Sequence, residues 1–461
     1  MGWGTYNDRA SSFPQVRQSA LGVATSSPDQ ARWDRTAVRA AITIVLAALG
    51  VRLVFVLWAP DGLVSDGEFY HGMALSILNG YGFSNFDGSA ANLWMPGWPA
   101  FLAAIYGIFG ISIGHAQIVL AVIGAGTTAL VIALGARIGS RRIALSAGAL
   151  HAFWPGLIFY SGVLFGETLF SFVFTSALLL IAVAAKAEKR PFAWTFAAGA
   201  ALGLAVWIRS EPVVYLAVAV ATFMSAGTTG RRLGARTVLI TLGLALVISP
   251  WTVRNAVVFG RFIPTAVNGG IVFYEGNHPG APGGPDLLAV TKLRSRLPHL
   301  SHAESNLRLS QLGWDEGFKY IRQHPVDFVR AAGKKLFLTY STDDRAPVLV
   351  RGFEGPRRIL PSSYVPIHGY ISESTMLTMQ RFANVYWWGI LMLVAVGMFH
   401  VRRWPRYMAV LVAGTLALAI AIHTLMIGGS RYHFPETPLL AILAAQGGIG
   451  IWNAVRRARL A

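Results

Sequence analysis

The sequence predicts an all-α polytopic membrane protein with about ten transmembrane helices (nine to thirteen), juxtamembrane helices and a larger extracytoplasmic region. Three observations lead to this fold class. The 461 residues are 54% apolar and only 13% charged, about half the charged share of a soluble domain. Long apolar runs recur along the chain, and Arg-rich loops separate many of them. The chain has no cysteine, which excludes disulfides and thiolate metal sites.

Ten apolar runs are candidates for crossing about 30 Å of hydrocarbon. They are residues 40–59, 114–136, 143–160, 163–185, 192–208, 212–226, 237–251, 383–399, 407–427 and 432–452. The runs 212–226, 237–251 and 432–452 have the shortest apolar cores. A further apolar segment, 96–109, opens with two prolines and is short for a crossing, so the charges of the loops must decide whether it spans.

The basic residues orient these spans. If residues 96–109 do not cross, the N-terminal segment, the short Arg-rich loops and the basic C-terminal end all lie in the cytoplasm, as the positive-inside rule requires. These segments hold 20 of the 39 Lys and Arg residues but only four of the 21 carboxylates. The net charge of +18 is therefore an orientation signal, compatible with anionic membrane lipids, and it indicates no nucleic-acid partner.

This topology divides the chain into four parts: a cytoplasmic tail, a transmembrane core, an extracytoplasmic region and a C-terminal group of helices with a basic cytoplasmic end. Their bounds are 1–39, 40–253 (with the first outer loop at 60–110), 254–382 and 383–461. Within the third part, residues 326–340 are amphipathic and suit a helix on the membrane surface. The absence of Asn-X-Ser/Thr sites and the Arg-rich composition favour a bacterial plasma (inner) membrane.

Ionisable side chains cluster at the outer ends of the spans. In the first outer loop, Ser65 and Glu68 have the spacing of a helix capping box, and such a helix would hold Asp66 rigidly as a general base. Each remaining charge, taken alone, is explained by snorkelling or by pairing with a neighbour. Together, several arginines beside carboxylates suit an anionic phosphate, which Arg binds bidentately. These residues are Glu167, Arg209, Glu211, Arg254 and Arg431.

Four motifs extend this pattern over about residues 40–450. They are Asp66-Gly-Glu-Phe-Tyr70 followed by Trp94-Met-Pro-Gly-Trp-Pro99, then Gly166-Glu-Thr-Leu-Phe170, Pro250-Trp-Thr-Val-Arg-Asn255 and Arg431-Tyr-His-Phe-Pro435. In order and spacing they resemble the GT-C membrane glycosyltransferases, in the branch of the dolichyl-phosphate-mannose–protein mannosyltransferases and the lipid A sugar transferases. The resemblance implies a GT-C type bundle in which residues 96–109 lie along the membrane.

The resemblance also implies an integral membrane enzyme. It would move a sugar, with inversion, from a polyprenyl-phosphate donor to a lipid, glycan or protein acceptor on the extracytoplasmic face. Asp66 matches the family's base, and Glu68 matches a second acid that many members carry directly beside the first. Many members have Arg or Lys where this chain has Trp94. The donor phosphate is therefore expected to bind Arg254 and Arg431, and Arg209 is the next candidate.

The other residues expected to bind substrate are Tyr70, Trp94, Glu167, Asn255 and His433. No metal ligand is expected, because phosphate is a stable leaving group and its departure requires neither a metal ion nor a general acid. A divalent cation remains an open alternative. The alternative from another class is a transporter or flippase of a lipid-linked sugar. Against it, the sequence has neither an internal repeat nor a Walker A loop.

Overall fold

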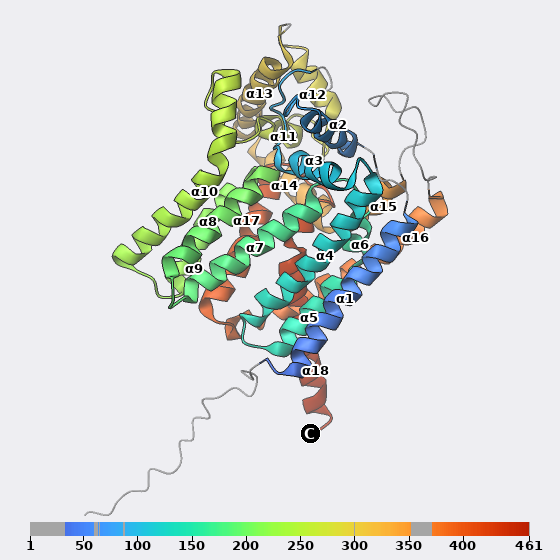
Figure 1. The fold of residues 1–461 in the computed structure, drawn as a ribbon, viewed down its shortest axis with the longest axis vertical. Helices are drawn as coiled ribbons and strands as arrows, with labels where there is room; N and C mark the ends of the chain where they lie inside the picture. Colours follow the sequence, from blue (N-terminus) through green and yellow to red (C-terminus); the bar gives the residue numbers. More distant parts are fainter. Residues whose placement is uncertain are drawn as a thin grey trace, which may run out of the picture.

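The computed structural model describes residues 33–59, 63, 65–85, 88–298, 300–351 and 371–460. Within them every regular element is a helix, apart from an isolated bridge between Ser84 and Ala90. Eight helices are long and apolar enough to cross a membrane, which confirms the all-α polytopic fold (Figure 1). They are α1 (Arg35–Trp58), α4 (Ile113–Ala136), α7 (Glu167–Lys186), α8 (Pro191–Ile208), α10 (Gly230–Phe259), α16 (Glu373–Met398), α17 (Arg406–Leu425) and α18 (Thr437–Ala458), the last preceded by the 3-10 turn η3 (Phe434–Glu436).

The two other predicted spans are built from shorter helices. Residues 143–160 form α5 (Arg141–Ala152) and α6 (Pro155–Tyr160), and residues 212–226 form the 3-10 turn η1 (Glu211–Tyr215) and α9 (Leu216–Ser225). The first break falls where Trp154 adopts an extended conformation, because a proline disfavours the helical conformation in the residue before it.

The break between α5 and α6 explains the arginine that interrupts the first span. Arg52 is buried on α1, and its Nη1 donates to the carbonyls of Ala48 at 3.0 Å and Ala152 at 3.1 Å. Its Nη2 donates to the carbonyl of His151 at 3.4 Å. The last carbonyls of α5 have no partner within their own helix, and a cation there is favoured by the helix dipole. Arg52 therefore caps a helix that ends inside the bundle.

The basic loops meet at one end of the bundle, which we call the basic end. Arg141, at the start of α5, forms an ion pair of 2.9 Å with Asp34, which caps α1. The hydroxyl of Tyr407, on α17, donates to the carbonyl of Arg137 after α4 at 3.3 Å, and Lys186 lies over the Tyr407 ring. The segregation of basic loops that the sequence predicts is thus a feature of the fold.

The opposite end carries two helices of the first outer loop, α2 (Asp66–Leu78) and α3 (Gly97–Phe109), which lie across the tops of the spans (Figure 1). The segment 96–109 is therefore no span. A Cβ on Gly97 would stand 2.5 Å from the carbonyl oxygen of Trp207, so only glycine lets α3 begin directly on the end of α8. Trp98 is buried and donates to the carbonyl of Leu164 at 3.2 Å, which locks α3 onto the core.

Five further helices stand at this end. They are α11 (Gly269–Gly276), α12 (Leu287–Arg294), α13 (His302–Gln323), α14 (Pro325–Tyr340) and α15 (Arg345–Arg351). The predicted amphipathic segment 326–340 is α14, whose Val326 and Phe337 are exposed. Its Lys335, however, is buried and donates to the carbonyls of Thr424 and Leu425 at 3.2 and 3.3 Å, so one face of α14 caps the end of α17.

The helix α10 is longer than its predicted span of 237–251. Its 30 residues measure about 45 Å, and Figure 1 shows it bending as it leaves the bundle. Pro250 lies inside it, and a proline removes one backbone hydrogen bond and kinks a helix. Arg254 and Asn255 therefore lie on this helix and not in the loop that was expected to begin at residue 254.

Candidate active site

The candidate site is centred on an ion pair between the first outer loop and the segment before α18. Nη1 of Arg431 donates to Oδ2 of Asp66 at 2.9 Å. The two side chains are 26% and 30% exposed, so a ligand can reach both. Although burial alone would lower the pKa of Arg431, Asp66 and Glu167, together with Tyr432, raise it well above its usual value, and the guanidinium stays charged.

Two more charges extend this pair into a row. Glu167, at the start of α7, is almost fully buried, and its Oε1 lies 3.9 Å from Nε of Arg431 and 3.8 Å from Nη1 of Arg209. Arg209 in turn donates to Glu211. Positive and negative groups alternate along the row, so each charge is compensated and each guanidinium is held in one orientation. The structure thus brings together Asp66, Glu167, Arg209 and Arg431, as the sequence predicts.

The backbone before Asp66 is unusual. Ser65 has φ 54° and ψ −127°, outside the regions that L-residues favour, and its side chain caps nothing in α2. The capping box is therefore a wrong prediction. Strained conformations of this kind cost about 1–3 kcal/mol and cluster at functional sites, which fits the position of Ser65 immediately before the proposed base.

Glu68, the second predicted acid, does not share a face of α2 with Asp66. Residues two positions apart point to different sides of a helix, and the Glu68 side chain is half-buried there. Asp66 is the carboxylate of α2 that pairs with Arg431.

Aromatic rings form one wall of the site. Tyr70 meets the rings of Trp94 and Phe165 edge-on, with centroids 6.5 and 6.4 Å apart. Arg431 lies over the Phe165 ring at 5.6 Å. Burial, with the added charge of Asp66, raises the pKa of Tyr70, so its hydroxyl stays neutral and acts only as a hydrogen-bonding group.

A groove is lined in part by residues of α2. Phe69 and Met73 follow Asp66 by three and seven positions, so all three lie on one face of the helix. The groove has a volume of about 440 Å³, within the range of small-molecule sites. Its lining residues are Phe69, Met73, Asn85, Leu93, Trp94, Arg294, His302 and Asn306. Trp94, expected to bind substrate, therefore lines this groove.

The structure uses Arg254 and Asn255 for other contacts. The Arg254 guanidinium donates to the carbonyls of Ala91 at 2.9 Å and Phe83 at 3.0 Å, and to Oδ1 of Asn255 at 3.0 Å. Nδ2 of Asn255 donates to the carbonyl of Ile263 at 2.9 Å. These residues fasten the first outer loop to α10 instead of facing Arg431, so the expected phosphate role of Arg254 is not supported.

His433 is also an anchor. Its ring is buried and stacks on Trp387 with centroids 4.2 Å apart, while Nδ1 donates to the carbonyl of Thr339 at 2.7 Å. Nε2 lies 3.4 Å from Oδ1 of Asp343, whose Oδ2 accepts from Nε1 of Trp154 at 2.8 Å. Although burial would lower the pKa of His433, Asp343 raises it. The pair holds in place the segment that carries Arg431.

Sequence reasoning missed a second anchor of this segment. Glu436 is buried and accepts from the hydroxyl of Tyr340 at 2.7 Å, and its other oxygen lies 2.9 Å from Nε2 of His423. Asp343 was missed too, since Asp343-Asp344 reads as a turn. Neither residue stands in a motif, because their partners lie far away in the sequence.

A third missed residue, Glu275, lies on α11. It is buried, and its Oε1 accepts from the backbone N–H of Asp286 at 3.3 Å. Burial raises the pKa of Glu275 to about 7 against the hydrogen bond from the Asp286 backbone, which lowers it. The charges of Asp286 and Asp66 add to the rise, and Arg431 opposes it. Glu275 therefore responds to the charges of the site, and its own charge changes near neutral pH.

Among the described residues, no group of three His, Asp or Glu side chains is arranged to hold a metal ion. The side chains that meet at the site offer a carboxylate that can accept a proton and two guanidinium groups that can bind an anion.

The sequence matches no protein-family model and no curated protein. The structure, however, is similar to the oligosaccharyltransferase AglB from Archaeoglobus fulgidus in complex with an inhibitory peptide and a dolichol-phosphate, at 14% identity over 92% of this chain and 51% of that chain, with a TM-score of 0.50. The apo form of the Archaeoglobus fulgidus oligosaccharyltransferase gives 14% identity, the same coverages and a TM-score of 0.52.

ArnT from Cupriavidus metallidurans bound to undecaprenyl phosphate is also similar, at 15% identity over 88% of this chain and 77% of that chain, with a TM-score of 0.39. The chain spans about half the length of the oligosaccharyltransferase. The likeness to the oligosaccharyltransferase defines the fold: the chain is a multi-pass membrane protein with the GT-C fold.

Proposed function

We propose that this protein is a membrane glycosyltransferase that moves a sugar from a polyprenyl-phosphate donor to an acceptor, with inversion. The observation that carries the proposal is the pairing of Asp66 with Arg431, next to a second arginine held by Glu167. A base and a phosphate-binding cation stand together, as such a transfer requires. In support, AglB, which shares the fold, has been solved with a dolichol-phosphate.

In the reaction, Asp66 takes the proton from an acceptor hydroxyl. The oxygen then attacks the anomeric carbon as the bond from that carbon to the phosphate oxygen breaks, so a single in-line displacement inverts the sugar. The charge that develops on the departing polyprenyl phosphate is stabilised by Arg431 and Arg209, which are already oriented.

Arg431 would link the base to the donor phosphate. Its Nη1 is bonded to Asp66 and its Nε faces Glu167, while no described residue bonds to Nη2. A donor phosphate that accepts from Nη2 would share the charge of the guanidinium with Asp66, which weakens the pairing and leaves that carboxylate more able to accept a proton. In this way donor binding would activate the base.

The acceptor would approach along the groove beside α2. Its wall includes Phe69 and Trp94, whose rings lie 5.3 Å apart, together with amide and guanidinium groups. A lipid, a glycan or a protein segment fits this mixture of apolar and polar contacts. By the positive-inside rule, the site faces the extracytoplasmic side of a bacterial plasma membrane, with both termini in the cytoplasm.

The test uses purified protein reconstituted in liposomes with a panel of radiolabelled polyprenyl-phosphate sugars and candidate acceptors. A transferase releases free polyprenyl phosphate and labels an acceptor. A flippase, the alternative, moves intact donor between leaflets and releases none. Relocation of intact donor without release would contradict the proposal.

A further inference from the structure

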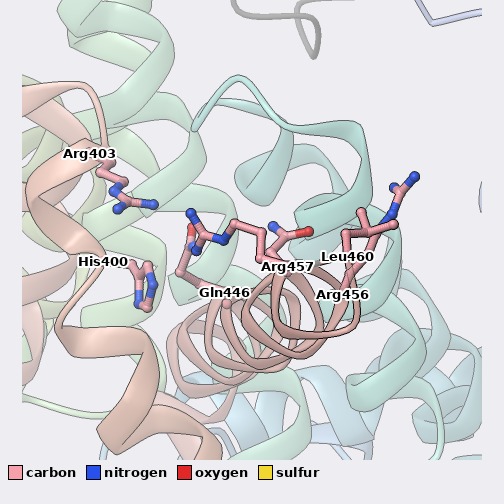
Figure 2. A pocket seen from close by; sticks show the side chains of 8 residues that line it. His400, Arg403, Gln446, Arg456, Arg457 and Leu460 are labelled. Atoms are coloured by element: carbon pink, nitrogen blue, oxygen red, sulfur yellow. The ribbon is translucent and has the colours of Figure 1, made fainter.

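The basic end of the bundle contains a second pocket, far along the helices from Asp66. It lies between the 3-10 turn η2 (Val401–Arg403), which follows α16, and the last turns of α18 (Figure 2). Its volume is about 390 Å³, within the range of ligand sites. The lining residues are His400, Arg403, Gln446, Gly450, Asn453, Arg456, Arg457 and Leu460.

The charges of this pocket are unbalanced. Three arginines line it and no carboxylate does, whereas Arg141 at the same end is paired with Asp34. Figure 2 shows the guanidinium of Arg457 turned towards Arg403, and in the described part of the chain neither has an acidic partner. Two like charges that face each other repel unless an anion lies between them.

One neutral group in the pocket is also oriented as a donor. Oε1 of Gln446 accepts from Nε1 of Trp404 at 2.9 Å, which leaves the amide N–H groups of Gln446 to donate. Nδ1 of His400 donates to the carbonyl of Val396 at 3.1 Å, so the neutral ring has no N–H left for a ligand. An oxyanion in this pocket would meet donors from both sides, Arg403 of η2 and Arg457 and Gln446 of α18.

Apolar side chains beside the pocket indicate where such an anion comes from. Met398 and Phe399 immediately precede His400, and Trp452 precedes Asn453; all three are more than half exposed. Exposed apolar side chains at the end of a membrane span contact lipid, and an aromatic ring there lies at the level of the headgroups. A molecule that combines acyl chains with a phosphate satisfies both features.

We propose that this pocket binds the phosphate headgroup of an anionic phospholipid in the leaflet at the basic end of the bundle. Basic pockets between transmembrane helices on the cytoplasmic side are suited to such headgroups. The proposal concerns a site at the opposite end of the molecule from Asp66 and stands independently of the proposed transferase activity.

The test measures lipid binding by native mass spectrometry of the purified full-length protein, titrated with phosphatidylglycerol or with phosphatidylcholine. The double variant Arg403→Gln/Arg457→Gln removes two charges from the pocket. The matched control Arg232→Gln/Arg402→Gln removes two charges from the same end outside it. Because Arg403 and Arg457 would each donate charge-assisted hydrogen bonds to the phosphate, whereas Arg232 and Arg402 lie outside the pocket, we expect phosphatidylglycerol affinity to fall about tenfold to thirtyfold in the pocket variant and less than about twofold in the control.

A second variant, Asn453→Asp, places a negative charge in the pocket and should also weaken phosphatidylglycerol binding without removing an arginine. Equal losses in the pocket and control variants would overturn the proposal, since general surface charge would then explain the binding. Equal binding of phosphatidylcholine and phosphatidylglycerol would also overturn the proposal. Competition by glycerol 3-phosphate at the concentration of the lipid itself would assign the pocket to a free phosphate compound instead.

Discussion

Arg431 donates a hydrogen bond of 2.9 Å to Asp66, although the two residues are 365 positions apart in the sequence. The contact joins the first outer loop to the segment between α17 and α18, and Glu167 connects it to Arg209. A carboxylate and two guanidinium groups are thereby fixed at one end of the membrane bundle. The following predictions separate the residues that would act on substrate from those that hold them.

Replacing Arg431 tests the donor site. Arg431→Lys keeps the charge but loses the planar fork that binds two phosphate oxygens, so we expect KM for the polyprenyl-phosphate donor to rise about tenfold to a hundredfold, with a much smaller change in KM for the acceptor. Initial-rate kinetics with each substrate varied in turn measure both. An unchanged donor KM would remove Arg431 from the phosphate site.

Arg254 provides the contrast. Arg254→Gln breaks the bonds to the carbonyls of Ala91 and Phe83, and we expect the free energy of unfolding to fall by about 2–4 kcal/mol, while donor KM in the folded fraction stays the same. The control is Arg261→Gln, which removes an exposed arginine and should change stability by less than about 1 kcal/mol. Weaker donor binding by a stably folded Arg254→Gln protein would restore Arg254 to the site.

Much of this arrangement can be predicted from the sequence. Hydropathy and loop charge predict most of the spans and the segregation of the basic loops, and the motifs predict that Asp66, Glu167 and Arg431 belong to one site. The broken helices α5 and α6 could not be bounded, since periodicity does not show that Arg52 caps the end of α5. Arg254 and His433 occupy motif positions, but the motif does not reveal that backbone carbonyls engage their donors.

The anchors are harder still to predict. Asp343 contacts His433 across some ninety positions, and Glu436 is contacted by Tyr340 at a similar separation. Long-range pairs of this kind leave no local spacing in a single sequence. Glu275 is equally hard to predict, because its raised pKa comes from burial in the folded protein and not from its neighbours along the chain.

Asp343→Asn tests the anchor of the Arg431 segment. The raised pKa of His433 means that its pairing with Asp343 stabilises the folded protein fully below the ordinary histidine pKa and is lost as pH rises through the raised value. We therefore expect the difference in thermal midpoint between wild type and Asp343→Asn to be larger at about pH 6 than at about pH 9. A difference that does not vary with pH would show that the pair is not ionic.

Glu275→Gln tests the buried carboxyl near the site. With a folded pKa of about 7 against an ordinary value of 4.5, stability is full below pH 4.5 and declines as pH rises to about 7, because the folded state retains its proton longer. Gln mimics the protonated form. The variant should match wild type at about pH 4.5 and exceed it by of the order of 1–3 kcal/mol at about pH 8.

The control for that prediction is Glu304→Gln, which neutralises a more exposed carboxylate that pairs with Arg261 and Arg308. It should show no comparable gain at high pH. If Glu275→Gln were less stable than wild type at about pH 8, the carboxylate would be held by stabilising contacts, and the electrostatic description of α11 would be incorrect.

The most direct test of the proposed function is the transfer rate of Asp66→Asn. The asparagine side chain has nearly the same shape, but its amide is not basic enough to take the proton from the acceptor hydroxyl. We therefore predict a transfer rate about 10²–10⁴-fold lower. The thermal midpoint should be unchanged, and the donor affinity should be no weaker than that of wild type. The measurement is release of free polyprenyl phosphate from radiolabelled donor in liposomes under single-turnover conditions. Transfer by Asp66→Asn within a few-fold of the wild-type rate would contradict the assignment of Asp66 as the base.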